Sequence, residues 1–282
     1  MTTHSGTIRE LLVQAQSQLR KSASARLDAE VLLAFVMQAP RESFYAHPEE
    51  PVAADQICDY QSLIARRASG FPVAYLTGVK EFWSTTLMVS QHTLIPRPET
   101  ECLVETALEL IPDQAGADVL DLGTGSGAIA IAVAAERPRS RITAVDIVGE
   151  SLAIAVDNTR RQELKNIRFV QSDWFAALAG VVFDCILCNP PYVDNQYHGF
   201  QDGEIRYEPR IALDGGHRGL AHISHIIPAA IRHLRPGGYL LLEHGYDQAP
   251  GVRQLLQLHG YTAIQTRRDY AGLERVSYAS WS

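Results

Sequence analysis

One segment sets the architecture of this chain: Asp118-Val-Leu-Asp-Leu-Gly-Thr-Gly-Ser-Gly127. It begins with a short apolar run typical of a buried strand, and glycines then follow at alternate positions. The next residues, Ala128 to Glu136, have a helical pattern. Glycine lets the backbone approach a ligand, and a helix N-terminus offers free N–H groups. This order of strand, glycine turn and helix therefore predicts a cofactor-binding loop.

Further residues extend this prediction to a nucleoside cofactor. Asp146 follows the expected strand 141–145, where a carboxylate can accept both hydroxyls of a ribose. Asp173 follows the expected strand 167–170 and can bond an adenine amino group, while Trp174 can stack on the ring. Alternatively, Trp174 is a partly buried core aromatic. The predicted cofactor-binding residues are Asp121, Gly123, Thr124, Gly125, Ser126, Gly127, Asp146, Asp173, Trp174 and Asn189.

Asp121 discriminates between two classes of cofactor. With Ala128 taken as the third small residue, the loop also satisfies the dinucleotide pattern, so a nicotinamide enzyme is a competing interpretation. A carboxylate just before the first glycine would repel a pyrophosphate, whereas it would pair well with the ammonium of a methionine moiety. The sequence therefore favours a cofactor that carries methionine.

A second motif, Asn189-Pro190-Pro191-Tyr192, follows the apolar run 183–188. Because proline fixes φ, lacks an N–H and restricts the residue before it, Asn189 and Pro190 are expected to be extended, with no competing donor near their carbonyls. The Asn189 side-chain oxygen and a neighbouring carbonyl can accept both hydrogens of an NH2 group, and the Tyr192 ring can lie against the planar group. Alternatively, the prolines merely end a strand with a stiff turn.

Read with the glycine loop, this tetrapeptide predicts methyl transfer onto a planar nitrogen. Asn189, Pro190 and Tyr192 are the predicted catalytic residues, and the same residues together with Pro191 are predicted to bind the substrate.

The motifs stand in the order found in S-adenosylmethionine-dependent methyltransferases, and the chain most resembles the HemK/PrmC family. Further segments carry this likeness: Gly70–Gly78, Glu81–Trp83, Leu94–Glu101 and Leu241–Gly245. It runs over nearly the whole chain and is weakest in residues 1–70. The resemblance implies S-adenosylmethionine as cofactor and, as substrate, the side-chain amide of the glutamine in the Gly-Gly-Gln motif of class I peptide chain release factors.

The chain is expected to contain two domains. A possible capping box at Thr7-Ile-Arg-Glu10 and helical patterns at 27–37 and 53–67 predict a small N-terminal helical bundle, residues 1–75, as the part that recognises the release factor. Residues 76–100 are expected to form a β-hairpin linker. Residues 101–282 are expected to form an α/β, Rossmann-like, seven-stranded methyltransferase domain, as the resemblance implies.

Composition bears on partners and location. The net charge is −7, and the first 80 residues carry equal numbers of acidic and basic side chains, so the excess lies in the remainder. Enzymes of nucleic acids usually show a basic surface, which makes a nucleic-acid partner a weaker interpretation. A DNA or rRNA N-methyltransferase with the same Asn-Pro-Pro-Tyr site stays the alternative. A methyltransferase-fold binding protein without catalysis is disfavoured by the intact tetrapeptide.

No apolar run reaches about 18 residues, and the start of the chain lacks a secretory-signal pattern, so no membrane association and a cytoplasmic location are expected. No metal site is predicted either. Cys185 and Cys188 would point to opposite faces of a strand, and the pair His222 and His225 lacks a third ligand.

Two connecting segments are candidates for substrate contacts. Arg97 is stiffened by a proline on each side, and in the resembling family this segment lies beside the active site; solvated linker charge is the other interpretation. The loop after Tyr192, as far as Leu220, is long, polar and rich in glycine, and such loops often carry binding contacts. Its middle, 194–203, is alternatively a plain mobile loop.

Overall fold

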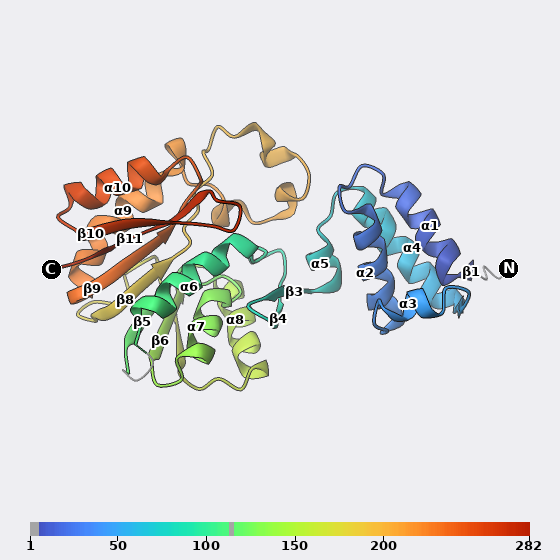
Figure 1. The fold of residues 1–282 in the computed structure, drawn as a ribbon, viewed down its shortest axis with the longest axis horizontal. Coiled ribbons are helices and arrows are strands. Elements are labelled where there is room, and N and C mark those ends of the chain that lie inside the picture. The colour runs from blue at the N-terminus through green and yellow to red at the C-terminus, as the bar shows by residue number, and fades with distance from the viewer. Residues whose placement is uncertain (1–5, 113–115) are drawn as a thin grey trace. The chain divides into compact units, whose positions relative to one another are not determined.

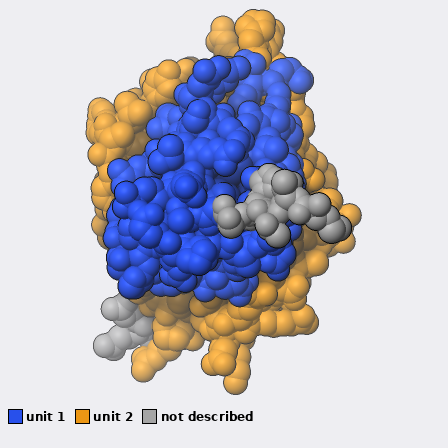
Figure 2. Space-filling model, turned by 90° about the vertical axis from the view of Figure 1, so that its right-hand side faces the viewer, with its two compact units in different colours: residues 1–78, 201–207 blue, residues 79–200, 208–282 orange. Residues whose placement is uncertain are grey.

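The computed structural model describes residues 6–112 and 116–282. It divides the chain into two compact units, each described here by itself (Figures 1 and 2). The N-terminal unit comprises residues 1–78 and 201–207, and the large unit comprises residues 79–200 and 208–282. The expectation about a secretory signal falls partly on residues 1–5, which lie outside the described residues.

The N-terminal unit is a small helical bundle. Its capping box is present, because the Glu10 backbone N–H donates to the Thr7 hydroxyl and the Thr7 N–H donates to the Glu10 carboxylate. One apolar face of each main helix meets in a common core that includes Leu11, Leu32 and Tyr60. The elements are β1 (Gly6–Thr7), α1 (Ile8–Gln18), α2 (Ala25–Met37), α3 (Ser43–Ala46), β2 (Pro51–Val52), α4 (Ala54–Ala68) and α5 (Val73–Thr77).

Residues 201–207 pack on this bundle, although the sequence analysis assigned them to the methyltransferase domain. Glu204 forms a 2.7 Å ion pair with Arg67, which also binds the buried Asp28. The Tyr207 ring lies 4.9 Å from the Phe71 ring, centroid to centroid. These contacts join segments far apart in the chain, so local sequence patterns do not reveal them.

The large unit is built on a seven-stranded sheet in the order β10-β11-β9-β8-β5-β6-β7 (Figure 1). β9, β8, β5, β6 and β7 are parallel, while β11 pairs antiparallel with β9 and with β10. The predicted α/β, seven-stranded fold is therefore confirmed. The strands are β5 (Asp118–Leu122), β6 (Arg141–Asp146), β7 (Ile167–Gln171), β8 (Phe183–Cys188), β9 (Leu234–Glu243), β10 (Thr262–Arg268) and β11 (Glu274–Ser280).

Helices cover both faces of this sheet, which explains why its central strands are almost continuously apolar. Helices α6 and α7 pack on one face and helices α9 and α10 on the other, each with its own core cluster. Cys185 belongs to the first cluster and Cys188 to the second, so the two thiols face opposite sides as predicted. The helices are α6 (Glu101–Leu110), α7 (Ala128–Glu136), α8 (Gly149–Arg161), α9 (Ala221–Ala230) and α10 (Ala249–Leu258).

The hairpin of β3 (Val79–Phe82) and β4 (Thr85–Met88) belongs to the large unit, whereas the sequence analysis assigned it to a separate linker. Phe82 and Leu87 are buried in the core under α6 and α7, and the Trp83 N–H donates to the Glu101 carboxylate. The Met88 N–H donates to the Asn158 side chain of α8. None of the described helices has the length and apolar character needed to cross a membrane.

Candidate active site

The four predicted motifs meet at one edge of the sheet. They follow β5, β6, β7 and β8, and the carboxyl ends of parallel strands lie at the same edge. β5 and β8 are neighbours in the sheet although two strands separate them in the chain. The chain order reverses between them, and such a switch point opens a crevice where ligands bind in α/β proteins.

A cavity of the large unit lies in this crevice. Eight of the predicted cofactor-binding residues line it: Gly123, Thr124, Gly125, Ser126, Asp146, Asp173, Trp174 and Asn189. Pro191 of the tetrapeptide lines it as well. Four predicted residues do not line the cavity: Asp121, Gly127, Pro190 and Tyr192. Each belongs to a motif that contributes other residues to the cavity wall. The remaining wall comes from Ala128, Ile129, Ser172, His222 and residues of the segments 92–100, 145–151 and 211–212.

The backbone of the glycine loop adopts a conformation that residues with a side chain rarely adopt. Gly123, Gly125 and Gly127 all have positive φ, at 73°, 57° and 86°. Gly127 is packed rather than open, because a Cβ there would lie 3.1 Å from Ala155 Cβ and 3.1 Å from Ile131 Cδ1. Gly127 therefore seats helix α7 against α8, while the other two glycines leave backbone on the cavity wall.

Asp121 lies fully buried beneath the glycine loop. Its Oδ2 accepts hydrogen bonds from the Thr124 hydroxyl at 2.6 Å and from the Ala130 N–H at 3.2 Å. Its Oδ1 has no partner among the described residues. Burial raises the Asp121 pKa to about 7, because no cation offsets the loss of water around the carboxylate. The sequence pattern did not reveal that this carboxylate turns into the loop.

Asp146 ties the glycine loop to the next strand. One carboxylate oxygen accepts from the Gly125 N–H at 2.8 Å, and the other accepts from the Val148 N–H at 2.9 Å. Burial raises the Asp146 pKa, while these two hydrogen bonds lower it. A further backbone contact, from Ile147, also lowers the pKa, and the Asp146 side chain lines the cavity.

Asp173 and Trp174, which follow β7, also line the cavity. Asp173 is exposed, and Trp174 is partly buried with a positive φ of 46°, which is uncommon for a bulky residue. The Trp174 ring packs against the core cluster of the α9 face and lies 5.5 Å from the His222 ring. The structure supports the interpretation of Trp174 as a partly buried core aromatic, and Trp174 also lines the cavity, where stacking on an adenine ring stays a prediction.

The Asn-Pro-Pro-Tyr tetrapeptide is held by residues of other elements. Asn189 Nδ2 donates to the Thr100 Oγ1 at 3.2 Å, and the Tyr192 hydroxyl donates to Glu243 Oε1 at 3.2 Å. Burial beside Glu243 raises the Tyr192 pKa. No described donor bonds the Pro190 carbonyl. Thr100 ends the turn η1 (Pro98–Thr100), and Glu243 ends β9.

Sequence reasoning missed Thr100 and Glu243 as parts of the site. The signal available was their position inside the family-like segments 94–101 and 241–245. Arg97 lines the cavity and forms an ion pair with the buried Glu208. It is therefore not solvated linker charge. No cluster of metal-binding side chains exists among the described residues, and the His222 ring bonds the Asp214 carbonyl.

Comparisons with known proteins identify the family. Residues 10–78 match the family model described as PrmC N-terminal domain, and residues 100–202 match the methyltransferase small domain. The release factor glutamine methyltransferase of Salmonella typhimurium strain LT2 is 48% identical over 266 residues, covering 94% of this chain and 96% of that protein. This chain belongs to the release factor glutamine methyltransferase family. The family member of Escherichia coli strain K12 has the same identity and coverage.

The family assignment confirms the resemblance to HemK/PrmC that the motifs predicted. A solved structure of a methyltransferase from Pyrococcus furiosus is similar in fold, with a TM-score of 0.53 over 77% of this chain and 95% of that chain. Its sequence identity is 19%, so this likeness concerns the fold alone. It agrees with the Rossmann-like methyltransferase fold of the large unit.

Proposed function

We propose that this protein methylates the side-chain amide nitrogen of the glutamine in the Gly-Gly-Gln motif of class I peptide chain release factors, with S-adenosylmethionine as methyl donor. The observation that carries the proposal is the meeting of Asn189 with the glycine loop at one cavity. The 48% identity to proteins named release factor glutamine methyltransferase supports the choice of substrate. Release factors act at the ribosome, so the proposal also implies a cytoplasmic location.

The residues of the cavity fit S-adenosylmethionine. The orphaned Asp121 Oδ1 is a buried acceptor that an ammonium group would satisfy. The Asp146 carboxylate suits the two ribose hydroxyls, and Asp173 with Trp174 suits the adenine ring. Gly123 and Gly125 supply close backbone approach. We assign cofactor binding to these residues and to Thr124, Ser126, Gly127 and Asn189.

The tetrapeptide fits a carboxamide substrate. We assign the two N–H groups of the substrate to two acceptors: the Oδ1 of Asn189, which lines the cavity, and the Pro190 carbonyl, which no described donor bonds. The nitrogen lone pair would then point toward the methyl donor as it localises. Tyr192, with Pro191 beside it, fixes the amide plane. The bound cofactor supplies a methyl group on a positively charged sulfur: a carbon–nitrogen bond forms as the carbon–sulfur bond breaks, and the nitrogen then gives one proton to water.

Positioning is the main contribution of these residues to catalysis. An amide nitrogen is a weak nucleophile because its lone pair is delocalised. Fixing its geometry against the methyl group can lower the barrier by about 7–11 kcal/mol in favourable cases. The N-terminal unit, whose sequence matches the PrmC N-terminal domain, is the proposed recognition surface for the release factor.

The experiment that tests the function incubates the purified protein with labelled S-adenosylmethionine and a recombinant release factor. A release factor with the Gly-Gly-Gln glutamine replaced is the matched control, and panels of RNA and DNA run beside it. Label confined to the intact glutamine is the expected result. Label on nucleic acid, with none on the release factor, would overturn the substrate assignment in favour of the nucleic-acid alternative.

A further inference from the structure

Arg97 supplies a positive charge to a cavity that is otherwise acidic. Among the described residues of the cavity wall it is the only arginine, and no lysine is present. Asp146 and Asp173 line the same cavity, and Asp121 lies buried beneath the glycine loop. The proposed cofactor carries one group that these carboxylates would repel, the carboxylate of its methionine moiety. That group needs a partner that offsets the repulsion.

Arg97 lies at the end of the cavity where the methionine moiety is expected. The proposed adenine, ribose and loop contacts follow β7, β6 and β5, and β8 is the next strand of the sheet. Arg97 directly precedes the turn η1, which the Thr100 N–H closes by donating to the Arg97 carbonyl at 3.1 Å. The Thr100 hydroxyl accepts from Asn189 Nδ2, and Asn189 follows β8. The turn is therefore fastened at the end of the cavity that lies beyond the glycine loop.

The two histidines of the cavity wall lie nearer its other end. The His222 ring is 5.5 Å from the Trp174 ring, centroid to centroid, where adenine is expected. The His92 carbonyl accepts from the hydroxyl of Ser151 at 2.7 Å, and Ser151 belongs to α8, the helix that follows β6. Neither histidine is held beside the tetrapeptide by a printed contact of this kind, whereas the Arg97 turn is.

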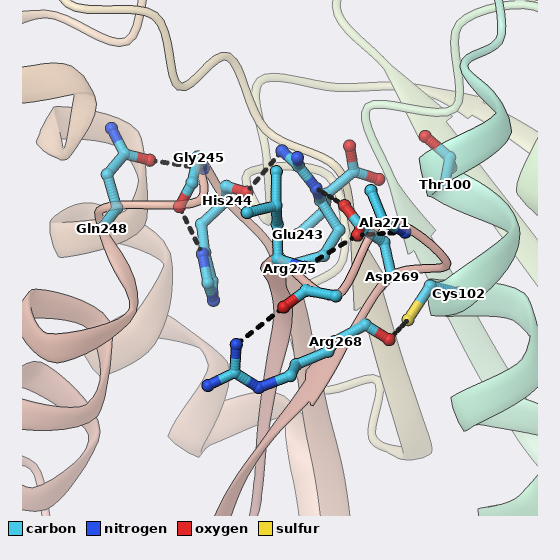
Figure 3. Close-up of polar contacts among 12 residues, drawn as sticks. Thr100, Cys102, Glu243, His244, Gly245, Gln248, Arg268, Asp269, Ala271 and Arg275 are labelled. Atoms are coloured by element: carbon cyan, nitrogen blue, oxygen red, sulfur yellow. Dashed lines mark hydrogen bonds and ion pairs between the residues drawn. The ribbon is translucent and has the colours of Figure 1, made fainter.

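A second arginine at this edge of the sheet has other partners. Arg275 lies at the start of β11 and does not line the cavity. Its Nε donates to Asp269 Oδ2 at 3.1 Å, and its Nη1 donates to the His244 carbonyl at 3.2 Å (Figure 3). Arg275 is thus engaged outside the cavity, which leaves the methionine end to Arg97.

Glu208 holds the Arg97 guanidinium without using all of its donors. The Glu208 side chain is buried, and it accepts from Arg97 Nη2 with one oxygen and from the Ile95 N–H with the other. No other described residue bonds the Arg97 side chain. A guanidinium has five N–H donors in a planar fork, so Nε and Nη1 remain for a carboxylate. The Arg97 side chain is 33% exposed, so a ligand can reach it.

We propose that Arg97 binds the carboxylate of the methionine moiety of S-adenosylmethionine, while Asp121 pairs with the ammonium of the same moiety. This inference rests on the cofactor assignment of the proposed function. The two side chains would together recognise both charges of an amino acid. The competing partner for the carboxylate is the N-terminus of α7, where Ala128 and Ile129 line the cavity.

The test compares two ligands by calorimetry, S-adenosylmethionine and decarboxylated S-adenosylmethionine, with the full chain and without release factor. The ratio of the two affinities should change by about 10- to 100-fold in Arg97→Gln, in favour of the decarboxylated ligand, as for the loss of a hydrogen bond between charged groups. Nearly all of the change should lie in the affinity for S-adenosylmethionine. Arg97→Lys should recover part of the ratio, because lysine keeps the charge but lacks the planar fork.

Two control variants separate a lost carboxylate contact from a damaged cavity. Asp146→Ala should weaken both ligands by the same factor, because both carry the ribose. Arg160→Gln removes an exposed arginine of α8 and should leave both affinities unchanged. The change in the ratio therefore reports the pairing of one side chain with one ligand group, as in a double-mutant cycle.

Two results would overturn the inference. An unchanged ratio in folded Arg97→Gln would leave the carboxylate to the N-terminus of α7, and equal losses for both ligands would mean that Arg97 only shapes the cavity. If Arg97→Gln does not fold, Arg97→Lys carries the test, with a smaller change of the ratio in the same direction expected.

Failure of the proposed function gives different results. A wild-type protein that binds neither ligand would defeat the cofactor assignment and this inference with it. A wild-type protein that loses the ratio on Arg97→Gln but leaves the release factor glutamine unmethylated would defeat the substrate assignment alone, and the role of Arg97 would stand.

Discussion

The Gly125 N–H donates to the Asp146 carboxylate at 2.8 Å, which fastens the middle of the glycine loop to the end of the neighbouring strand. One side chain thus shapes the loop and also faces the cavity. Loss of Asp146 should therefore affect the cofactor site in two ways, through the missing acceptor and through a looser loop.

Asp146→Ala should weaken S-adenosylmethionine binding by about 10- to 100-fold, since a hydrogen bond to a charged group contributes about 1.5–3 kcal/mol. Calorimetric titration measures this directly. Asp157→Ala is the matched control, because Asp157 is an exposed carboxylate of α8 that pairs with the exposed Arg160 of the same helix. Wild-type affinity in Asp146→Ala would refute the ribose role.

Asn189→Ala should reduce the single-turnover rate far more than it reduces cofactor affinity. The variant loses the oxygen that accepts the substrate N–H, and a single preorganised group of this kind contributes about 100- to 1,000-fold to the rate. Rapid-quench measurements with the release factor, beside a cofactor titration, separate the two quantities. An unchanged chemical step would remove Asn189 from the catalytic residues.

Asp121 should release a proton when S-adenosylmethionine binds at pH 6. Its pKa of about 7 in the free protein means that the carboxyl is then mostly protonated, and a bound ammonium would favour the ionised form. Affinity should accordingly fall as the pH drops below 7. Calorimetry in buffers of different ionisation enthalpy counts the released protons.

Asp121→Asn is the control for this measurement, because it keeps the shape and an acceptor oxygen but does not titrate. A binding heat at pH 6 that is the same in all buffers for the wild-type protein would argue against a direct pairing of Asp121 with the ammonium.

Gly127→Ala should destabilise the large unit by about 2–4 kcal/mol. A side chain in the left-handed conformation costs about 1–2 kcal/mol, and the added Cβ also meets Ala155 and Ile131 at 3.1 Å. Gly237→Ala is a matched control, because Gly237 has a similar φ of 80° and open space around it. Denaturant unfolding of both variants tests this, and equal losses would mean that packing at Gly127 adds nothing.

Much of the fold, and several of the residues that line the cavity, follow from local sequence patterns. The strand Asp118–Leu122, the helix Ala128–Glu136 and the strand Phe183–Cys188 occur at the predicted residues. Hydrophobic periodicity, glycine and proline act over a few residues, so such boundaries are readable in one dimension. The opposite facing of Cys185 and Cys188 follows from the two-residue period of a strand.

Tertiary structure alone decided which residues support the site. Thr100 contacts Asn189 from 89 positions away, and Glu243 contacts Tyr192 from 51 positions away. The hydrogen bond from the Thr124 hydroxyl to Asp121 and the packing of residues 201–207 in the N-terminal unit also appear only in the tertiary structure. The sequence by itself determined the elements and the motif chemistry because these depend on neighbouring residues. Strand order in the sheet determines which distant side chains meet, and no local pattern encodes that order.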